Sequence, residues 1–305
     1  MADALKSSAP AVVCLGVFDG VHRGHRALID RARVIADELD IAVSVMTFDP
    51  HPLLVLRPEL APKMLASVSE RKELLLAAGA DNVYVLDFTE ATSHLAPRDF
   101  VERIVVNQLN ARAVVVGKNF WFGHEAAGDV QVLKALGVEY GFDVDSIDIQ
   151  GGGGAQWSST NVRRLIAAGE VAAAAEILDR DYRLAGVVVH GDERGRELGF
   201  PTANLQIDQS RAVPADGVYS GWVTTGGLGR LAAAISIGTN PQFDGTERRI
   251  EAFVLDRDDL DLYDQELSVD FVARVRGQAV FADLGALVAA MNTDVAMTRK
   301  LLAID

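Results

Sequence analysis

The sequence predicts an α/β doubly wound N-terminal domain followed by a small antiparallel β-barrel that ends in a helix. In the first half of the chain, strand-like and helix-like segments alternate, which is typical of a parallel sheet built from βα units. From Tyr182 onward, short apolar runs are separated by glycine-containing turns with no helices between them. The boundary between the two patterns lies at about residue 182, so the predicted domains are residues 1–182 and 183–305.

Five strands and four helices account for the first pattern. Apolar runs predict strands, and segments with helical periodicity and capping residues predict helices; either Ser67 or Ser69 caps the second helix, and Pro97 begins the third. The expected strands are residues 11–17, 41–48, 82–87, 113–117 and 143–149, and the expected helices are residues 24–39, 69–78, 97–108 and 129–140.

After the four glycines at 151–154, the expected elements change. Two short helices, residues 161–168 and 171–178, form a connector to the second pattern. There the expected strands are residues 184–190, 217–224, 231–237, 250–255 and 267–275, followed by a helix over 284–302.

Composition limits the function classes. The chain has 305 residues, 49% of them hydrophobic, and a net charge of −14, which argues against broad nucleic-acid binding and against membrane-surface binding. The one cysteine, Cys14, excludes an intrachain disulfide framework and indicates a reducing compartment. The N-terminus lacks the features of a signal peptide, so the sequence predicts a cytoplasmic protein and leaves a homo-oligomer open.

Two histidines stand in the turn between the first strand and the first helix. The segment Gly16-Val17-Phe18-Asp19-Gly20-Val21-His22-Arg23-Gly24-His25 places His22 and His25 at a helix N-terminus, where the helix dipole attracts anions. Histidines in a polar turn are usually solvated surface groups. Here they open a crevice at a strand carboxyl end, which favours a nucleotide phosphate site and resembles the HxGH nucleotidyltransferase superfamily. Gly16, Phe18 and Gly24 belong to the same predicted site.

Two further segments belong to the first domain's predicted site. Ser159, Thr160 and Arg163 open a second helix, which is suited either to clamping phosphates or to an ordinary N-cap beside a surface arginine. Asn119 and Phe120 follow the fourth strand, where aromatic rings stack on a flat heterocycle or cover the sheet.

The second domain carries one dense motif, Gly191-Asp192-Glu193-Arg194-Gly195-Arg196-Glu197-Leu198-Gly199-Phe200-Pro201-Thr202-Ala203-Asn204-Leu205. Its glycines and arginines form a loop able to wrap phosphates, and the predicted nucleotide-binding residues are Gly191, Arg194, Gly195, Arg196, Gly199 and Pro201. If the segment is extended, Thr202 and Asn204 project to one face, and their oxygens suit Mg²⁺.

Glu251 is the candidate general base of the second domain. Alternation over 250–255 predicts that it shares an apolar face with Phe253 and Leu255. A carboxylate there is either at a strand end in water or retained to accept a proton during phosphoryl transfer. The sequence contains no P-loop and no protein-kinase catalytic loop, so a kinase site would need another phosphate cradle.

Taken together, the segments at 16–25, 47–52, 158–163, 191–205 and 238–263 resemble the prokaryotic bifunctional riboflavin kinase/FMN adenylyltransferases, also called FAD synthetases. The resemblance implies that the barrel phosphorylates riboflavin with ATP and that the first domain joins FMN to AMP, giving FAD and pyrophosphate. Both steps would use Mg²⁺ with ATP.

The resemblance also implies roles for single residues. His22, His25, Ser159, Thr160 and Arg163 would handle phosphates in the adenylyltransferase. Thr202 and Asn204 would bind Mg²⁺–ATP, and Glu251 would be the kinase base. The flavin-binding residues would be Asn119, Phe120 and Arg299.

Three positions depart from the family's common pattern. Ala96 replaces the usual serine before Pro97, Gln242 stands where threonine is frequent, and Asp264 stands where glycine is usual. Two alternatives remain: an adenylyltransferase for pantetheine phosphate or nicotinamide nucleotide with an unrelated C-terminal domain, and a flavin-binding carrier or regulator without turnover.

Overall fold

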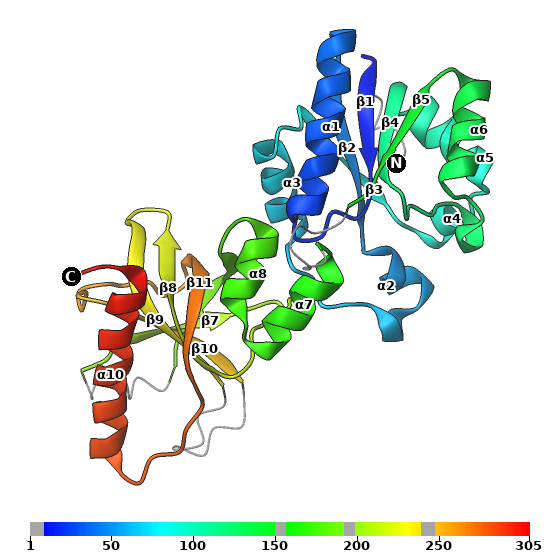
Figure 1. The fold of residues 1–305 in the computed structure, drawn as a ribbon. Helices are drawn as coiled ribbons and strands as arrows, with labels where there is room; N and C mark the ends of the chain where they lie inside the picture. Colours follow the sequence, from blue (N-terminus) through cyan, green and yellow to red (C-terminus); the bar gives the residue numbers. More distant parts are fainter. Residues whose placement is uncertain (1–8, 150–156, 192–198, 239–247) are drawn as a thin grey trace. The chain divides into compact units, whose positions relative to one another are not determined.

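The computed structural model describes residues 9–149, 157–191, 199–238 and 248–305. The chain forms two compact units, Met1–Ser159 and Thr160–Asp305. Each has its own sheet, and we describe each by itself (Figure 1).

The first unit is built on five parallel strands in the order β3-β2-β1-β4-β5. Residues of β1 are fully buried, because this strand lies in the middle of the sheet. The strand bounds are β1 Ala11–Leu15, β2 Ala42–Asp49, β3 Asn82–Asp87, β4 Ala111–Gly117 and β5 Asp143–Ile147.

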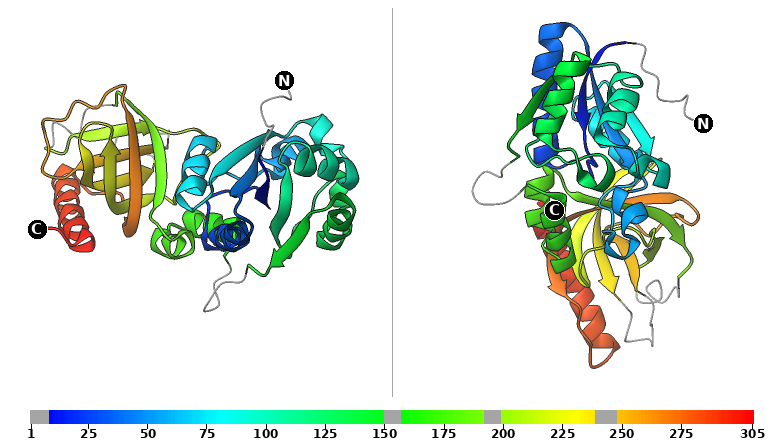
Figure 2. Two further views of the ribbon diagram at one scale, coloured as in Figure 1. Left: turned by 90° about the horizontal axis from the view of Figure 1, so that it is seen from above. Right: turned by 90° about the vertical axis from the view of Figure 1, so that its right-hand side faces the viewer.

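Helices cover both faces of this sheet (Figures 1 and 2). On one face, α1 (Arg23–Leu39) and α3 (Val68–Ala77) bury apolar side chains such as Ile29 and Leu75 against the strands. On the other face, α5 (Pro97–Phe100), the π-helix η3 (Val101–Val106) and α6 (Val130–Tyr140) form a second core around residues such as Leu133. The predicted doubly wound fold is confirmed.

Some elements differ from the expectation. Ser67, and not Ser69, caps α3, because the Glu70 side chain completes a reciprocal capping box with it. The single helix expected over 97–108 is divided into α5 and η3. Four short helices were not predicted: α2 (Pro52–Leu56), η2 (Pro58–Leu60), α4 (Glu90–Ser93) and η4 (His124–Ala126). His51 caps α2 by accepting a hydrogen bond from the Leu53 amide.

The second unit is a closed antiparallel barrel in the order β10-β7-β6-β11-β8-β9. The helices α7 (Ser159–Ala168, beginning at the last residue of the first unit) and α8 (Val171–Leu178) precede it, and α10 (Leu284–Leu302) packs against β8, β9 and β11. The strands are β6 Tyr182–Val189, β7 Thr202–Gln206, β8 Gly217–Thr225, β9 Gly229–Gly238, β10 Arg249–Val254 and β11 Glu266–Gly277.

The barrel with its terminal helix was predicted, but β7 was not. Its sequence, Thr-Ala-Asn-Leu-Gln, contains a single large apolar residue and reads locally as a loop. Pairing with β6 and β10 makes it a strand.

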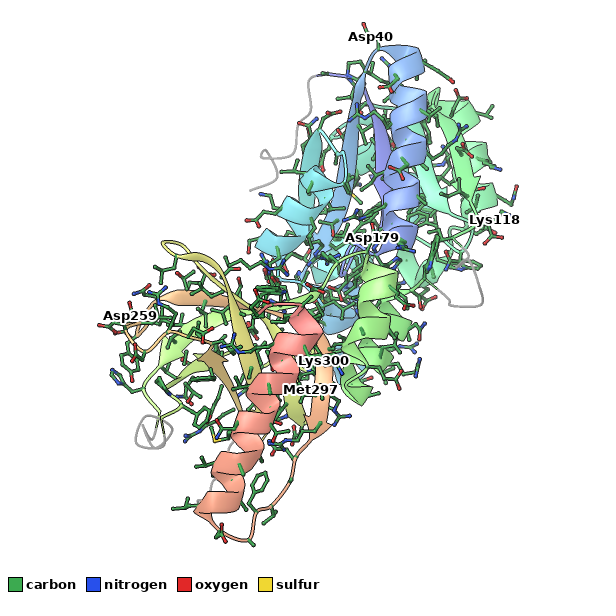
Figure 3. The ribbon with its side chains drawn as sticks, turned by 60° about the vertical axis from the view of Figure 1, so that its left-hand side comes forward. Asp40, Lys118, Asp179, Asp259, Met297 and Lys300 are labelled. Carbon is green, nitrogen blue, oxygen red and sulfur yellow. The ribbon has the colours of Figure 1, made fainter. Side chains whose placement is uncertain are left out.

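Aspartates end two of the helices. Asp40 follows α1 and Asp179 follows α8, and Figure 3 labels both residues. They adopt left-handed conformations with φ of 54° and 60°. Aspartate tolerates this region better than most residues, so both helices end there without a glycine.

Candidate active sites

The first candidate site lies where the order of strands reverses. β1 is flanked by β2 on one side and β4 on the other, so the connections that leave β1 and β4 diverge at the carboxyl edge of the sheet. Open α/β sheets bind ligands in the crevice at this point. The histidine loop follows β1, and Asn119 and Phe120 follow β4, so both predicted segments leave the sheet at this edge.

His22 and His25 stack on each other at the start of α1. Their ring centroids are 3.7 Å apart with 19° between the planes, and the Phe18 ring lies 5.0 Å from that of His25. His22 is the N-cap residue, but its side chain makes no capping hydrogen bond, and the first turn of α1 contains no acidic residue. The helix N-terminus therefore offers positive potential and two imidazoles to an anion.

The backbone before the histidines is held by buried polar contacts. Asp19 is 1% exposed, and its carboxylate accepts hydrogen bonds from the amides of Leu65 and Ala66. Its carbonyl oxygen accepts a hydrogen bond of 2.8 Å from the Ser159 hydroxyl. The structure thus brings the predicted Ser159 to the histidine loop.

Thr160 lies on the first turn of α7 and Arg163 begins its second turn, both in the second unit. Thr160 is exposed and Arg163 is half-buried. Their predicted phosphate contacts remain predictions.

Two predicted glycines are needed for close packing in the histidine loop. A Cβ atom on Gly24 would lie 2.0 Å from Ile149 Cγ2 and 3.1 Å from the His22 ring. A Cβ atom on Gly16 would lie 3.2 Å from the Phe18 ring. Larger residues would displace the aromatic and imidazole rings of the site.

In the loop after β4, two of the aromatic residues cover the sheet, and the predicted stacking on a heterocycle remains a prediction. Phe120 stacks on Phe122 at 5.7 Å between ring centroids, and both pack against the core that covers the sheet. Trp121, between them, is 61% exposed. Asn119 is exposed, with its Oδ1 atom 2.9 Å from where a Cβ on Gly117 would lie.

The second candidate site is the face of β7 and β10 that points away from the barrel core. Asn204 pairs with Glu251 and Thr202 pairs with Phe253. Directly paired residues share a face, so the predicted metal ligands and the predicted base are neighbours. Neither strand could be aligned with the other from the sequence alone.

Glu251 does not lie on the core face of its strand. The fully buried residues of β10 are Ile250, Ala252 and Val254, which point into the barrel, whereas Glu251 and Phe253 are half-buried on the opposite face. The prediction that Glu251 shares a face with Phe253 is therefore confirmed, although that face is not the core face. The expectation for Leu255 is wrong, because β10 ends at Val254 and alternation does not extend to it.

The side-chain oxygen of Asn204, Oδ1, is buried, and it accepts no hydrogen bond from any described residue. Gly191 lies against the same amide, since a Cβ there would be 2.2 Å from Asn204 Nδ2. An unpaired buried carbonyl is costly, which indicates a site built to hold another group.

The other residues predicted for the second site have mixed outcomes. Gly199 adopts a φ of +85°, which only glycine takes readily. Arg194, Gly195, Arg196 and Gln242 lie outside the described residues. Arg299 pairs with Asp256 and also donates to the backbone carbonyl of Asp305, so its flavin contact remains a prediction.

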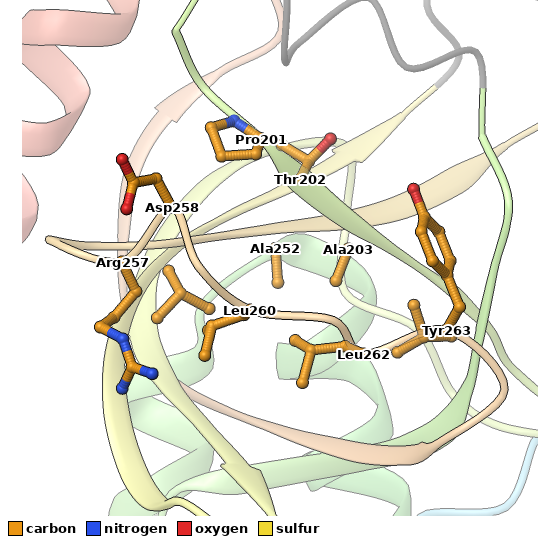
Figure 4. A pocket seen from close by; sticks show the side chains of 11 residues that line it. Pro201, Thr202, Ala203, Ala252, Arg257, Asp258, Leu260, Leu262 and Tyr263 are labelled. Carbon is orange, nitrogen blue, oxygen red and sulfur yellow. The ribbon is translucent and has the colours of Figure 1, made fainter.

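A pocket next to Thr202 was missed by sequence reasoning. Figure 4 shows Ala203, Ala252, Leu260 and Leu262 in its middle, with Arg257 and Asp258 at one end and Tyr263 at the other. Its walls come from β6, β7, β10 and the segment after β10, which only barrel closure brings together. An apolar pocket with a charged end and a tyrosine suits a flat heterocycle.

Comparison with known proteins agrees with this division into two sites. The FAD synthetase family model matches residues 4–161, and the riboflavin kinase family model matches residues 178–302. Proteins named bifunctional riboflavin kinase/FMN adenylyltransferase are similar over almost the whole chain. The one from Pseudomonas fluorescens is 39% identical over 293 residues, covering 96% of this chain and 93% of the relative. The one from Escherichia coli K12 is 36% identical over 299 residues, covering 96% and 94%.

The chain belongs to the bifunctional riboflavin kinase/FMN adenylyltransferase family. The predicted family and its two enzyme classes, a kinase and a nucleotidyltransferase, are confirmed. The predicted domain boundary at 182 falls after the start of the kinase match and after the division between the compact units.

A solved structure from Streptococcus pneumoniae, titled as a macrolide-efflux protein, has the same fold as both units of our chain. It superposes with a TM-score of 0.88 at 31% identity, covering 97% of this chain and 96% of that one.

Among the residues that our structure describes, no helix is both long and apolar enough to span a membrane.

Proposed function

We propose that the first unit transfers the adenylyl group of ATP to FMN. A phosphate oxygen of FMN attacks the α-phosphorus of ATP, the bond to the β-phosphate oxygen breaks, and pyrophosphate leaves. No covalent enzyme intermediate is needed, so catalysis rests on positioning and on stabilising negative charge. The stacked histidines at the open N-terminus of α1 are the observation that carries this proposal.

In this proposal, His22 and His25 donate hydrogen bonds to the α-phosphate and to the departing pyrophosphate. Ser159 and Thr160 add hydroxyl groups, and Arg163 adds a guanidinium that is suited to bidentate phosphate binding. A donor of this kind is typically worth about 3–4 kcal/mol in the transition state. Asn119 and Phe120, on the loop after β4, would lie near the flavin.

We propose that the barrel phosphorylates the 5′-hydroxyl of riboflavin. Glu251 accepts the hydroxyl proton as the oxygen attacks the γ-phosphorus of ATP, and ADP leaves. The loop that contains Gly191 and Gly199 cradles the phosphates. The pocket over Ala203 and Ala252, next to Thr202, takes the adenine ring.

The residues of the second site fit a magnesium ion. Mg²⁺ prefers a few hard oxygen ligands from protein and keeps water and phosphate oxygens for the rest. The unpaired Asn204 Oδ1 atom and the Thr202 hydroxyl on the same face are such ligands. When bound, the ion would neutralise charge on the ATP phosphates, while Glu251 beside it accepts the proton.

The test is to incubate the purified protein with ATP, Mg²⁺ and either riboflavin or FMN, and to separate the flavins by chromatography. We expect FMN and then FAD from riboflavin, and FAD from FMN. Unchanged riboflavin would contradict the kinase, unchanged FMN would contradict the adenylyltransferase, and binding of both flavins without turnover would favour a carrier. Adenylylation of pantetheine phosphate or nicotinamide nucleotide in place of FMN would favour the other alternative.

Two variants separate the sites. Glu251→Gln is expected to lower FMN formation by about 10²–10⁴-fold and leave FAD formation from FMN intact. His25→Ala is expected to lower FAD formation by about 10²–10³-fold and let FMN accumulate. The exposed substitutions Glu266→Gln and Glu38→Gln are matched controls in the same units. Equal loss of both activities in either variant would contradict the assignment of two sites.

A further inference from the structure

Arg71 is a buried cation beneath the histidine loop. It lies on α3 and is 1% exposed. Its Nη1 atom has two N–H groups, one of them shared, within hydrogen-bond distance of three acceptors: 3.0 Å to the Val17 carbonyl, 2.8 Å to Thr47 Oγ1 and 2.9 Å to the Phe48 carbonyl. The Thr47 hydroxyl in turn donates to the same Val17 carbonyl at 2.7 Å.

These acceptors mark the carboxyl ends of two neighbouring strands. β1 ends at Leu15, so the Val17 carbonyl lies beyond the sheet, and Thr47 and Phe48 are the two residues before Asp49, the last residue of β2. The residue after Val17 is Phe18, which adopts a φ of 54° and contacts His25. Arg71 therefore fixes the backbone at the point where it leaves the sheet and turns toward the histidines.

The segment that leads into α3 and includes Arg71, residues 65–71, holds the histidine loop at a second point. The amides of Leu65 and Ala66 bind the Asp19 carboxylate, two residues after Val17. The capping box between Ser67 and Glu70 then fixes the start of α3, from which Arg71 projects. Residues 65–71 thus bind both the backbone and the side chain of the loop that precedes His22.

Stability alone is a weak reason to bury this guanidinium. Burial lowers the pKa of Arg71, against the opposing effect of Asp19 and Asp49, so the charge is kept at a cost. A well-packed apolar side chain often stabilises a core as well as a buried charge does. The side chain supplies directed donors instead, and small displacements of catalytic groups cost large factors in rate.

We propose that Arg71 is a positioning residue for adenylyl transfer, holding Val17 and thereby Phe18 and the histidine pair in the geometry that the phosphates require. This inference rests on the proposed FMN adenylyltransferase function of the first unit. It assigns Arg71 no contact with ATP or FMN.

The test compares Arg71→Met, Arg71→Lys and Lys72→Met in the full chain. Arg71→Met keeps an apolar stem without donors and is expected to lower kcat for FAD formation by about 10²-fold, with KM for ATP changed by less than about threefold. Arg71→Lys is expected to recover kcat to within about fivefold of the wild type, because all three hydrogen bonds come from one nitrogen and an ammonium has three donors. Lys72, exposed on the same helix, is the control, and its variant should match the wild type.

Riboflavin phosphorylation by the same molecules and thermal melting curves report on folding. Rates are measured well below the melting temperature of every variant, so that a purely stabilising role for Arg71 would leave kcat unchanged. A folded Arg71→Met protein with wild-type kcat for FAD, or an Arg71→Lys protein as slow as Arg71→Met, would overturn the inference. A wild-type protein that makes no FAD would instead contradict the proposed function.

Thr47→Val gives an independent check. Because Thr47 and Arg71 share the Val17 carbonyl, their effects on kcat should be coupled. We expect the double variant, Thr47→Val with Arg71→Met, to form FAD no more slowly than Arg71→Met alone. If the losses in kcat of the two single variants multiply in the double variant, the proposed network is wrong.

Discussion

Asn204 and Glu251 are directly opposite each other on the antiparallel strands β7 and β10. Side chains paired in this way have Cβ atoms about 4.5–5.5 Å apart. A carbonyl oxygen that accepts no hydrogen bond from the described residues and a carboxylate therefore meet on one face of the barrel. This spacing suits an ion on a phosphate oxygen beside a base that accepts the proton of the attacking hydroxyl.

Asn204→Leu keeps the side-chain size and removes the oxygen. We expect FMN formation to fall by about 10²-fold or more, since one preorganised electrostatic contact is typically worth that much, while FAD formation from FMN continues. Asn204→Asp keeps an oxygen and should instead change the Mg²⁺ concentration that gives half-maximal rate. Both effects are measured from initial rates of FMN formation at varied Mg²⁺ concentration. Gln206→Leu, exposed on the same face of β7, is the control, and equal losses in it and in Asn204→Leu would contradict the prediction.

Gly24→Ala tests the packing of the histidine loop. The added methyl group would lie 2.0 Å from Ile149 Cγ2, on a β-branched side chain with little freedom to move. We expect a loss of about 1–3 kcal/mol in the free energy of unfolding and slower FAD formation, with riboflavin phosphorylation preserved. Thermal melting and the two rate assays measure these effects. Gly227→Ala, where the methyl group meets no atom within 4 Å, should be near neutral.

Asp264 stands where the family usually has glycine, and its backbone conformation is one that favours glycine. Its φ is 59°, a left-handed conformation that glycine adopts without strain. We expect Asp264→Gly to be neutral or to stabilise the barrel by up to about 1 kcal/mol, because the relief of strain offsets the greater freedom of the unfolded chain. Asp261→Gly, without a positive φ, should destabilise it by about 0.5–1 kcal/mol. Chemical denaturation measures both, and the opposite order would show that the strain is absent.

Cys14 should be inert in the folded protein. Burial raises the pKa of its thiol from 9.0 to about 12, and Sγ lies 3.6 Å from the Leu28 carbonyl oxygen. A thiol-reactive chromogenic disulfide at pH 8 should therefore label no thiol in the native state, and one per chain after denaturation. Rapid native labelling would contradict burial of this thiol.

The same thiol makes stability depend on pH in one direction. Above pH 9 the unfolded chain loses the proton and the folded chain keeps it until about pH 12, so the unfolded state binds fewer protons. The contribution of Cys14 to the free energy of unfolding then falls by up to about 1.4 kcal/mol per pH unit over this window. Denaturation curves of the wild type and Cys14→Ala, which lacks this group, isolate the contribution as their difference.

Local patterns were enough to predict much of this protein. The βα alternation predicted the parallel sheet, because each amphipathic helix must cover a buried strand. The spacing of His22 and His25 after an apolar strand placed them at a helix N-terminus, since strand, turn and helix are adjacent in the chain. The motif ending in Thr202 and Asn204 indicated a phosphate and metal site because two residues apart on an extended chain share a face.

The tertiary structure decided what depends on residues far apart in the chain. Alternation in 250–255 could not show which face of β10 is buried, and closure of the barrel turned Ile250 and Ala252 inward and Glu251 outward. β7 became a strand only by pairing with its neighbours. Arg71 lies 54 residues from Val17, and no local pattern on α3 predicts that its side chain reaches the end of β1. The sequence alone thus determined most of the elements and the chemistry of their ends, whereas register, burial and long-range hydrogen bonds, which depend on the packing of the whole unit, determined which groups meet.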